Sequence, residues 1–285
     1  EAKKILLNNI FGVDIDSQAV EVTKLSLLLK VLENESREGM EQQLKMFKER
    51  ALPNIDGNIK CGNSLIGPDF YEGQLSLQDT VGTRHAVSGN EDGAKINPFD
   101  WEREFPDIMK RGGFSAVIGN PPYVRQEALG EFKDYFKANY KVFHGMADLY
   151  AYFIERGISL LRDNGIFTYI VANKWMRASY GEPLRRWLKQ QNIVRIIDFG
   201  DLPVFQNATT YPCILSVAKG KAGGAFAATQ VKTLEFANLN EYVEQNKYKV
   251  RSAGLEDNGW SLSDDKTQKV INKIMSAGEP LSKYV

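Results

Sequence analysis

The sequence contains few of the side chains that build metal centres and disulfides. Among its 285 residues there are two cysteines and two histidines. Cys61 and Cys213 lie far apart and outside any Cys-x-x-Cys spacing, so they predict neither a zinc site nor a disulfide framework. Two histidines are too few for a histidine-rich metal centre. Because unpaired cysteines are typical of the reducing cytoplasm, we expect a cytoplasmic protein without a metal site.

Long apolar runs are also missing. No stretch approaches the roughly 20 residues that span a bilayer, and none has the form of a secretory signal peptide. We therefore expect no association with a membrane. The sequence lacks an initiator methionine, and residues 1–7 have the pattern of a helix already under way. We expect this chain to be part of a longer polypeptide.

Neither sign of charge is in excess. The 36 Lys and Arg residues balance 36 Asp and Glu residues, which counts mildly against binding to nucleic acid, since such domains are often basic. The distribution is uneven, because basic side chains outnumber acidic ones strongly in residues 174–195. A solvated helix face and a phosphate-contacting surface explain this run equally well. Its basic members are Lys174, Arg177, Arg185, Arg186, Lys189 and Arg195.

The sequence does contain the alternation of an α/β fold. Hydrophobic residues make up 43% and charged residues 25%, and the length suits one large domain with a smaller appendage. Short apolar runs alternate with helical patterns, which predicts a mostly parallel, doubly wound sheet. The last two expected strands should pair with each other. Expected strands cover residues 9–15, 59–61, 114–118, 166–171, 193–199 and 211–218, and expected helices follow Ser17 and cover 35–52, 148–161, 180–191 and 266–276.

Two segments interrupt this alternation. Residues 67–98 are rich in Gly, Asp, Asn and Ser, which predicts a long loop or insertion. Residues 219–224 (KGKAGG) have the composition of a linker, and the regular pattern weakens after them. We therefore expect a domain boundary between residues 219 and 220.

The tetrapeptide Asn120-Pro121-Pro122-Tyr123 follows the apolar run 114–118. It stands at the carboxyl end of an expected central strand, where open α/β sheets bind their ligands. Taken alone, it is equally consistent with a turn that ends a strand. In the chemical interpretation, the two prolines hold the loop stiff, because the proline ring fixes φ.

The tetrapeptide suits one reaction in particular. The exocyclic amine of adenine is a poor nucleophile, because its lone pair is delocalised into the ring. The side-chain oxygen of Asn120 and the carbonyl of Pro121 can each accept one N–H and free the lone pair for attack, which is catalysis by preorganised acceptors. Tyr123 can stack on an adenine flipped out of a duplex. The loop therefore predicts catalysis at a planar amino group.

Two further segments fit a bound nucleoside. Asp14 ends the first expected strand, and an acid at that place can bind the hydroxyls of a ribose. Asp16 stands just before Ser17 and is better suited to capping the next helix. The turn 62–65 (GNSL) contains Asn63, which can meet the ring edge of an adenine. Each segment is weak evidence by itself.

In combination, these segments resemble a known family. They occur in the order typical of the amino-methyltransferases of restriction–modification systems in the gamma class, and the resemblance is greatest to type II enzymes that fuse restriction and modification. It covers roughly residues 5–218. The segments that carry it are Phe11–Asp16 (FGVDID), Cys61–Leu65 (CGNSL), Ile118–Tyr123 (IGNPPY), Asp148–Tyr150 with Phe153, Gly165–Trp175 (GIFTYIVANKW) and Val204–Ala208 (VFQNA).

The resemblance implies a role for particular residues. Asp14 matches the acid that binds the cofactor ribose, and Ile15 matches the apolar residue against the cofactor adenine. Asn63 stands where the family usually has an aspartate, so it keeps an acceptor oxygen and loses a charge. Phe205 matches the aromatic that covers the second face of the flipped base, although an ordinary core phenylalanine explains it equally well. The other residues assigned to the cofactor pocket are Ser64, Asn120, Pro122 and Phe153.

The same resemblance implies the fold, cofactor and partners. It implies a Rossmann-like, S-adenosylmethionine-dependent methyltransferase, cytoplasmic and prokaryotic, that modifies adenine N6 at a specific site in double-stranded DNA. Residues 1–219 would be the catalytic domain, and residues 220–285 a linker and the start of a target-recognition domain. Nuclease and target-recognition domains could belong to the same polypeptide.

One family motif is absent from the sequence. The Gly-rich strand-to-helix loop that holds the methionine part of the cofactor does not occur in the 285 residues. We expect it upstream of Glu1, so the chain should lack its first strand and bind S-adenosylmethionine weakly or not at all. Three alternatives stay open: a protein-glutamine methyltransferase, an RNA-adenine methyltransferase, and a non-catalytic DNA-binding or assembly module.

Overall fold

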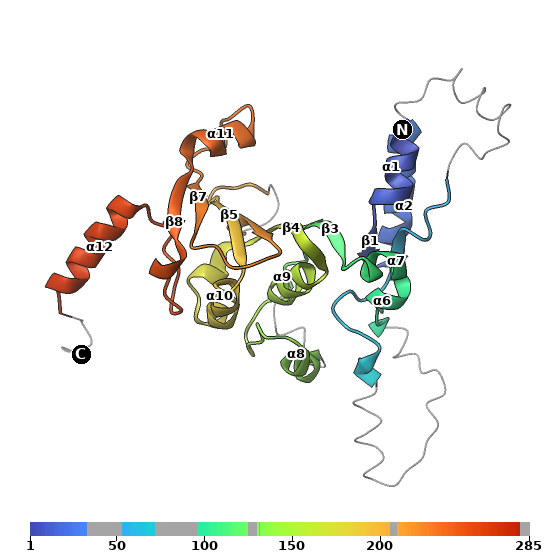
Figure 1. Ribbon diagram of the computed structural model, residues 1–285, viewed down its shortest axis with the longest axis horizontal. Coiled ribbons are helices and arrows are strands. Elements are labelled where there is room, and N and C mark those ends of the chain that lie inside the picture. The colour runs from blue at the N-terminus through green and yellow to red at the C-terminus, as the bar shows by residue number, and fades with distance from the viewer. Residues whose placement is uncertain (33–52, 72–95, 125–129, 131, 206–209, 280–285) are drawn as a thin grey trace, which may run out of the picture. The chain divides into compact units, whose positions relative to one another are not determined.

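A computed structural model describes residues 1–32, 53–71, 96–124, 130, 132–205 and 210–279. The chain forms two compact units, Glu1–Phe105 and Pro106–Val285, whose elements are labelled in Figure 1. The expected helix at 35–52 and most of the expected loop at 67–98 lie outside the described residues. In the described ranges, no helix has both the length and the apolar character that crossing a membrane requires.

The first unit contains a two-stranded parallel sheet and its helices. Strands β1 (Gly12–Asp14) and β2 (Ile59–Cys61) pair with Asp14 opposite Cys61. Helix α1 (Ala2–Asn9) precedes β1, α2 (Ser17–Leu32) follows it, and α6 (Trp101–Glu104) lies near the end of the unit. One apolar core joins α1, α2 and β2. Its buried members are Leu6, Val20, Val31, Ile55 and Ile59.

Polar side chains fix the chain at both ends of β1. The side-chain amide of Asn58 is buried and donates to the carbonyls of Leu7 and Ile10, each at 2.9 Å. It thereby satisfies carbonyls at the end of α1 that have no partner within the helix. At the other end, Oδ1 of Asp16 accepts from the backbone N–H of Gln18 at 2.8 Å. The expectation that Asp16 caps α2 is therefore confirmed.

The second unit is built on a six-stranded sheet in the order β3-β4-β6-β5-β7-β8. β3 is parallel to β4, and β5 is parallel to β7, whereas β6 is antiparallel to both of its neighbours and β8 is antiparallel to β7. The α/β, Rossmann-like class is thus as predicted, and so is the pairing of the last two expected strands. The strands are β3 (Phe114–Gly119), β4 (Leu161–Ala172), β5 (Asn192–Asp198), β6 (Pro212–Ala218), β7 (Ala225–Gln230) and β8 (Tyr248–Arg251).

One expectation about this sheet is wrong. The strand before Asn120 was expected at the centre of the sheet, but β3 is the edge strand of the six. Accordingly, Ile118 is 85% exposed. An apolar run predicts a strand, but it does not show how many neighbouring strands that strand has.

Helices connect these strands. Figure 1 shows α9 (Tyr150–Ser159) beside β4 and α11 (Leu239–Asn246) beside β7. The helix expected at 148–161 is shorter than predicted, since α9 covers Tyr150–Ser159 and β4 already begins at Leu161. Asn164 lies within β4, where the pairing with β3 is irregular. The remaining helices are α7 (Pro106–Lys110), α8 (Lys133–Asn139), α10 (Glu182–Leu188) and α12 (Asp265–Ala277), with short 3-10 turns η3 (Asn173–Met176), η4 (Ser179–Gly181) and η5 (Ser252–Gly254).

The sheet continues past the predicted linker. β7 follows the Gly-rich segment 219–224 and pairs with β5 through residues 227–230. Further along, Trp260 is buried and lies edge-on to Trp175, with ring centroids 5.2 Å apart. Residues as far as Leu262, which is also buried, therefore belong to the second compact unit. The functional division at residues 219 and 220 remains a prediction.

Candidate active site

The loop Asn120–Tyr123 begins directly after β3. Asn120 and Pro122 are exposed, whereas Pro121 is buried. The preceding residue, Gly119, packs against Tyr169 of β4, and a Cβ at that position would lie 2.8 Å from the tyrosine ring. At the far end of the loop, the carbonyl of Val124 accepts from the N–H of Leu149 at 3.1 Å. Both ends of the loop are therefore attached to the sheet and to the start of α9.

Tyr123 and Phe205 come together in this unit, although more than 80 residues separate them in the sequence. Their ring centroids lie 6.5 Å apart with an interplanar angle of 68°. Burial raises the pKa of Tyr123 to about 12, so its hydroxyl is protonated at neutral pH. In the described part of the chain this buried hydroxyl has no hydrogen-bond partner. The two side chains that sequence reasoning assigned to a flipped base are thus neighbours.

Phe153 lies on the first turn of α9. Its backbone N–H donates to the carbonyl of Leu149 at 3.3 Å, and Leu149 is the residue that anchors the end of the Asn120 loop. Phe153 therefore belongs to the same helix end as that anchor, and its side chain is partly exposed.

The first unit brings Asp14, Ile15 and Asn63 to one edge. Because β1 and β2 are parallel, their carboxyl ends lie side by side, and the N–H of Gly62 donates to the carbonyl of Asp14 at 2.8 Å. Oδ1 of Asp14 accepts from the N–H of Asp16 at 2.8 Å, which shapes the turn into α2. Ile15 in this turn is 55% exposed. An acid and an exposed apolar side chain thus stand next to each other, as binding of an adenosine requires.

Asn63 and Ser64 follow β2 at the same edge. Oδ1 of Asn63 accepts from the N–H of Leu65 at 3.2 Å, so the side-chain oxygen stabilises its own turn. The carbonyl of Ser64 accepts from the indole of Trp101 at 3.1 Å. Gly62 lies so close to Phe99 that a Cβ would be 2.4 Å from the ring. This close approach explains the glycine that precedes Asn63.

A cavity of about 640 Å³ also lies in the first unit, lined by α2 and β2. Its Lys24 binds Asp56 at 2.7 Å, and this hydrogen bond is the main reason that the pKa of Lys24 is raised. Asp14 and Asn63 do not line the cavity. The cavity and the edge predicted to bind a cofactor are therefore different places.

The predicted site residues divide between the two units. Asp14, Ile15, Asn63 and Ser64 belong to the first unit, and Asn120, Pro121, Pro122, Tyr123, Phe153 and Phe205 belong to the second. Within each unit the structure gathers the predicted residues at or beside the ends of parallel strands.

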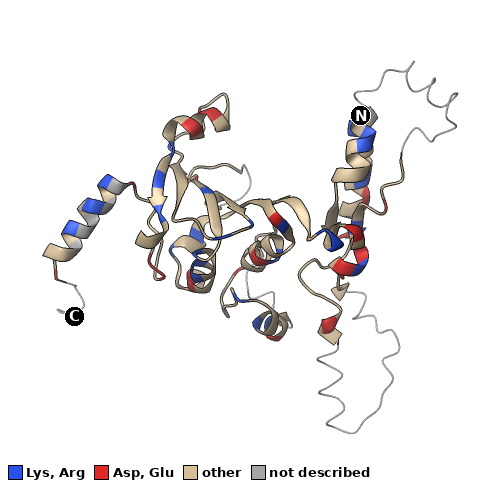
Figure 2. Cartoon of the chain, viewed as in Figure 1, with Lys and Arg blue, Asp and Glu red and all other residues tan. Residues whose placement is uncertain are grey.

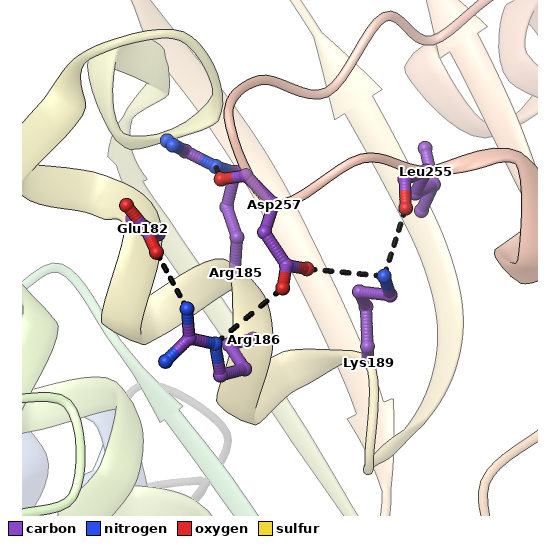
Figure 3. Close-up of polar contacts among 6 residues, drawn as sticks. All are labelled: Glu182, Arg185, Arg186, Lys189, Leu255 and Asp257. Carbon is purple, nitrogen blue, oxygen red and sulfur yellow. Dashed lines mark hydrogen bonds and ion pairs between the residues drawn. The ribbon is translucent and has the colours of Figure 1, made fainter.

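Most of the basic run at 174–195 binds within the chain. In Figure 3, the carboxylate of Asp257 binds Lys189 at 3.0 Å and Arg186 at 3.4 Å. The hydrogen bond from Lys189 is the main cause of the lowered pKa of Asp257. Arg186 also binds Glu182 at 2.5 Å, and Arg195 binds Glu244 at 2.9 Å.

Arg185 is fully buried at the centre of these contacts. Its guanidinium donates to three backbone carbonyls, those of Trp175 at 2.5 Å, Ala178 at 2.7 Å and Asp257 at 2.8 Å. Burial lowers the pKa of this group. The run is thus neither a wholly solvated face nor a wholly phosphate-contacting one. Three of its members, Lys174, Arg177 and Arg186, are exposed. Figure 2 shows further Lys and Arg positions, coloured blue, along α12.

Sequence reasoning missed the pair Asn173 and Asp198, at the base of the connection that carries Phe205. Asp198 ends β5 and is 4% exposed, and its Oδ1 accepts from the side-chain amide of Asn173 at 2.8 Å. The available signal was an acid at the end of an apolar strand, the same signal that drew attention to Asp14. Asn173 lies in the segment 165–175, which was matched as a motif without a role for this residue.

The fold and the comparisons with known proteins define the class. The structure superimposes on part of the Type ISP restriction-modification enzyme LlaGI with a TM-score of 0.53 and 12% sequence identity, covering 93% of this chain and 22% of that one. Residues 8–205 match the sequence model of the family described as Eco57I restriction-modification methylase. The chain belongs to this family, and the predicted resemblance to restriction–modification methyltransferases is confirmed.

Curated relatives agree with this assignment. The chain is 30% identical over 290 residues to the type II restriction enzyme and methyltransferase RM.Eco57I of Escherichia coli, covering 99% of this chain and 26% of the relative. It is 25% identical over 235 residues to the adenine-specific methyltransferase BrxX of Escherichia coli O9:H4 (strain HS), covering 65% of this chain and 19% of the relative. The chain thus spans about a quarter or less of the length of these relatives.

Proposed function

We propose that the protein transfers a methyl group from S-adenosylmethionine to the N6 amine of an adenine in a specific DNA sequence, as the modification part of a restriction–modification system. The observation that carries this proposal is the loop Asn120–Tyr123 at the carboxyl end of β3, with Tyr123 next to Phe205. Family membership and the adenine specificity in the name of the relative BrxX support it.

The role of each loop residue follows from its chemistry. Asn120 is exposed, and its side-chain oxygen would accept one N–H of the target amine, while the carbonyl of Pro121 would accept the other. Two acceptors in fixed positions favour a nitrogen whose lone pair is available for attack. Pro121 and Pro122 restrict the backbone of the loop. Tyr123 and Phe205 would hold the base, with the hydroxyl of Tyr123 protonated.

The edge of the first unit fits the adenosine part of the cofactor. When bound, S-adenosylmethionine supplies an electrophilic methyl group. Within the described residues, one carboxylate oxygen of Asp14 has no hydrogen-bond partner and is available to a ribose hydroxyl. Ile15 offers exposed apolar surface for the adenine, and Asn63 would meet its ring edge. Ser64 belongs to the same edge of the first unit. In the second unit, Asn120, Pro122 and Phe153 are proposed as cofactor-binding residues from the resemblance to the family.

Binding of the cofactor by this chain alone is a separate proposal. The 285 residues contain no Gly-rich loop for the methionine part of the cofactor, so we propose that they bind S-adenosylmethionine weakly or not at all. Titration calorimetry on the isolated chain should show no binding at micromolar concentrations. A micromolar dissociation constant would contradict this proposal.

The partner and location follow from the same proposal. The partner would be double-stranded DNA, with nuclease and target-recognition domains as possible parts of the same polypeptide and residues 220–285 as the start of target recognition. Cys61 and Cys213 are both free thiols, which fits a cytoplasmic location.

The test is transfer of tritiated methyl groups by the intact protein. Duplex DNA, RNA and a glutamine-containing peptide are offered separately, and the DNA product is digested to identify N6-methyladenine. Asn120→Ala should lower transfer about 100-fold or more, because a preorganised acceptor is lost. Asn246→Ala removes an exposed amide at the end of α11 and serves as the matched control. Methylation of RNA or peptide in place of DNA would favour the alternative substrates, and transfer that survives Asn120→Ala would reject this mechanism.

A further inference from the structure

The loop between β5 and β6 carries Phe205. It leaves the sheet after Asp198 and returns at Pro212, and at its base the N–H of Phe199 donates to the carbonyl of Pro212 at 3.1 Å. Gly200 has a φ of +58°, a conformation that glycine adopts without strain. The part of this loop before Phe205 is therefore held close to the sheet.

One residue outside the loop holds both of its ends. The side-chain amide of Asn173 donates to Oδ1 of Asp198 at 2.8 Å, where the loop begins. The backbone N–H of Asn173 donates to the carbonyl of Tyr211 at 2.7 Å, where the loop returns to the sheet. Asn173 directly follows β4, so it joins the end of this neighbouring strand to both ends of the loop.

Asp198 depends on these contacts. The side chain is 4% exposed, and no lysine or arginine among the described residues forms an ion pair with it. A buried carboxylate is costly unless hydrogen bonds compensate for its lost hydration. Here Oδ1 accepts from Asn173 and, at 3.0 Å, from the N–H of Gly200. The same oxygen thus fixes both the neighbouring strand end and the first turn of the loop.

We infer that Asn173 and Asp198 are positioning residues: they hold residues 199–205, the described start of the connection between β5 and β6, in the conformation that brings Phe205 next to Tyr123. This inference rests on the proposed function for the role of Phe205 on the target base. The restraint that Asn173 and Asp198 place on the loop does not depend on the proposed function. The residues act through Phe205 and do not themselves touch the base.

Hydrogen exchange tests the restraint without any DNA. In the intact protein, Asn173→Ala should increase amide exchange in residues 199–205 about tenfold, because a hydrogen bond to a buried charge is lost. Asp198→Asn keeps an acceptor oxygen and should increase exchange less than Asp198→Ala. The matched control is Thr168→Val, which breaks a hydrogen bond of 3.1 Å to Ser216 between β4 and β6 in the same sheet. Equal exchange in Asn173→Ala and the control would overturn the inference.

Kinetics test the consequence for the base. With duplex DNA carrying 2-aminopurine at the target position, Asn173→Ala should reduce the fluorescence change on binding and raise KM for DNA about tenfold, with KM for S-adenosylmethionine unchanged. A change in both KM values would indicate general damage and overturn the assignment. If the wild-type protein does not methylate DNA, the proposed function fails, and the exchange experiment alone decides whether Asn173 and Asp198 restrain the loop.

Discussion

The ring of Phe205 meets the ring of Tyr123 edge-on, at 68° and 6.5 Å between centroids. A planar base stacks on two aromatic side chains at once only when their rings are nearly parallel. In the proposed function, an adenine bound between the two rings would therefore require the side chain of Phe205 or Tyr123 to rotate.

Phe205→Ala should weaken binding of the target base. Stacking of a base on an aromatic side chain contributes about 1–3 kcal/mol, so the dissociation constant for duplex DNA with an unpaired target should rise roughly 5- to 160-fold, as measured by fluorescence anisotropy. Phe236→Ala, which removes a ring 5.2 Å from Tyr242 in the same unit, is the control. Equal losses in both variants would mean that Phe205 is an ordinary core residue.

Asp14→Asn should weaken cofactor binding while leaving the turn intact. In the wild type, the N–H of Asp16 donates to Oδ1 of Asp14 at 2.8 Å, and the amide of the variant keeps an oxygen for this bond. The amide lacks the charge that strengthens hydrogen bonds to ribose hydroxyls. Hydrogen bonds to charged groups contribute about 1.5–3 kcal/mol, so the affinity of the intact protein for S-adenosylmethionine should fall at least about tenfold by calorimetry. Asp16→Asn, at the helix cap two residues later, should bind the cofactor as the wild type does. The prediction is wrong if the two variants behave alike.

Arg185→Met should destabilise the protein far more than Arg186→Gln. The buried guanidinium of Arg185 serves three backbone carbonyls, and each carbonyl left without a partner costs about 1 kcal/mol. The expected loss is therefore about 3 kcal/mol in urea unfolding. The Arg186 side chain is 61% exposed, and exposed ion pairs contribute about 0–1 kcal/mol. Similar losses in both variants would show that Arg185 does not fasten the segment around Asp257.

Glu155 should make stability depend on pH in the acidic range. Burial raises its pKa above 4.5, although the N–H groups of Val142 and Lys141 partly oppose the shift. Because the folded state binds this proton more tightly, its contribution to stability is present below pH 4.5 and is lost as pH rises through the raised pKa. Thermal melts should show that Glu155→Gln flattens the pH dependence in this window. An unchanged slope would exclude Glu155 as its source.

The strands and the candidate site loop Asn120–Tyr123 could be predicted because their signals are local. Apolar runs such as 114–118 and 193–199 mark strands to within about a residue at each end, and the chemistry proposed for Asn120 and the prolines depends on residue type alone. The capping role of Asp16 could also be predicted, since a cap acts within three residues. The direction of β6 and the edge position of β3 could not be predicted, because strand pairing involves residues far apart in the sequence.

The sequence by itself determined the α/β class, the family and the identity of the residues at the two strand ends, Asp14 and Asn120, since these depend on short segments with fixed spacing. Only the tertiary structure decided that Tyr123 meets Phe205, that Arg185 is buried against Asp257, and that Asn173 holds Asp198. The physical reason is the same in each case. These contacts join segments that the chain brings together only when the sheet forms, and no local pattern encodes which buried polar group will satisfy another.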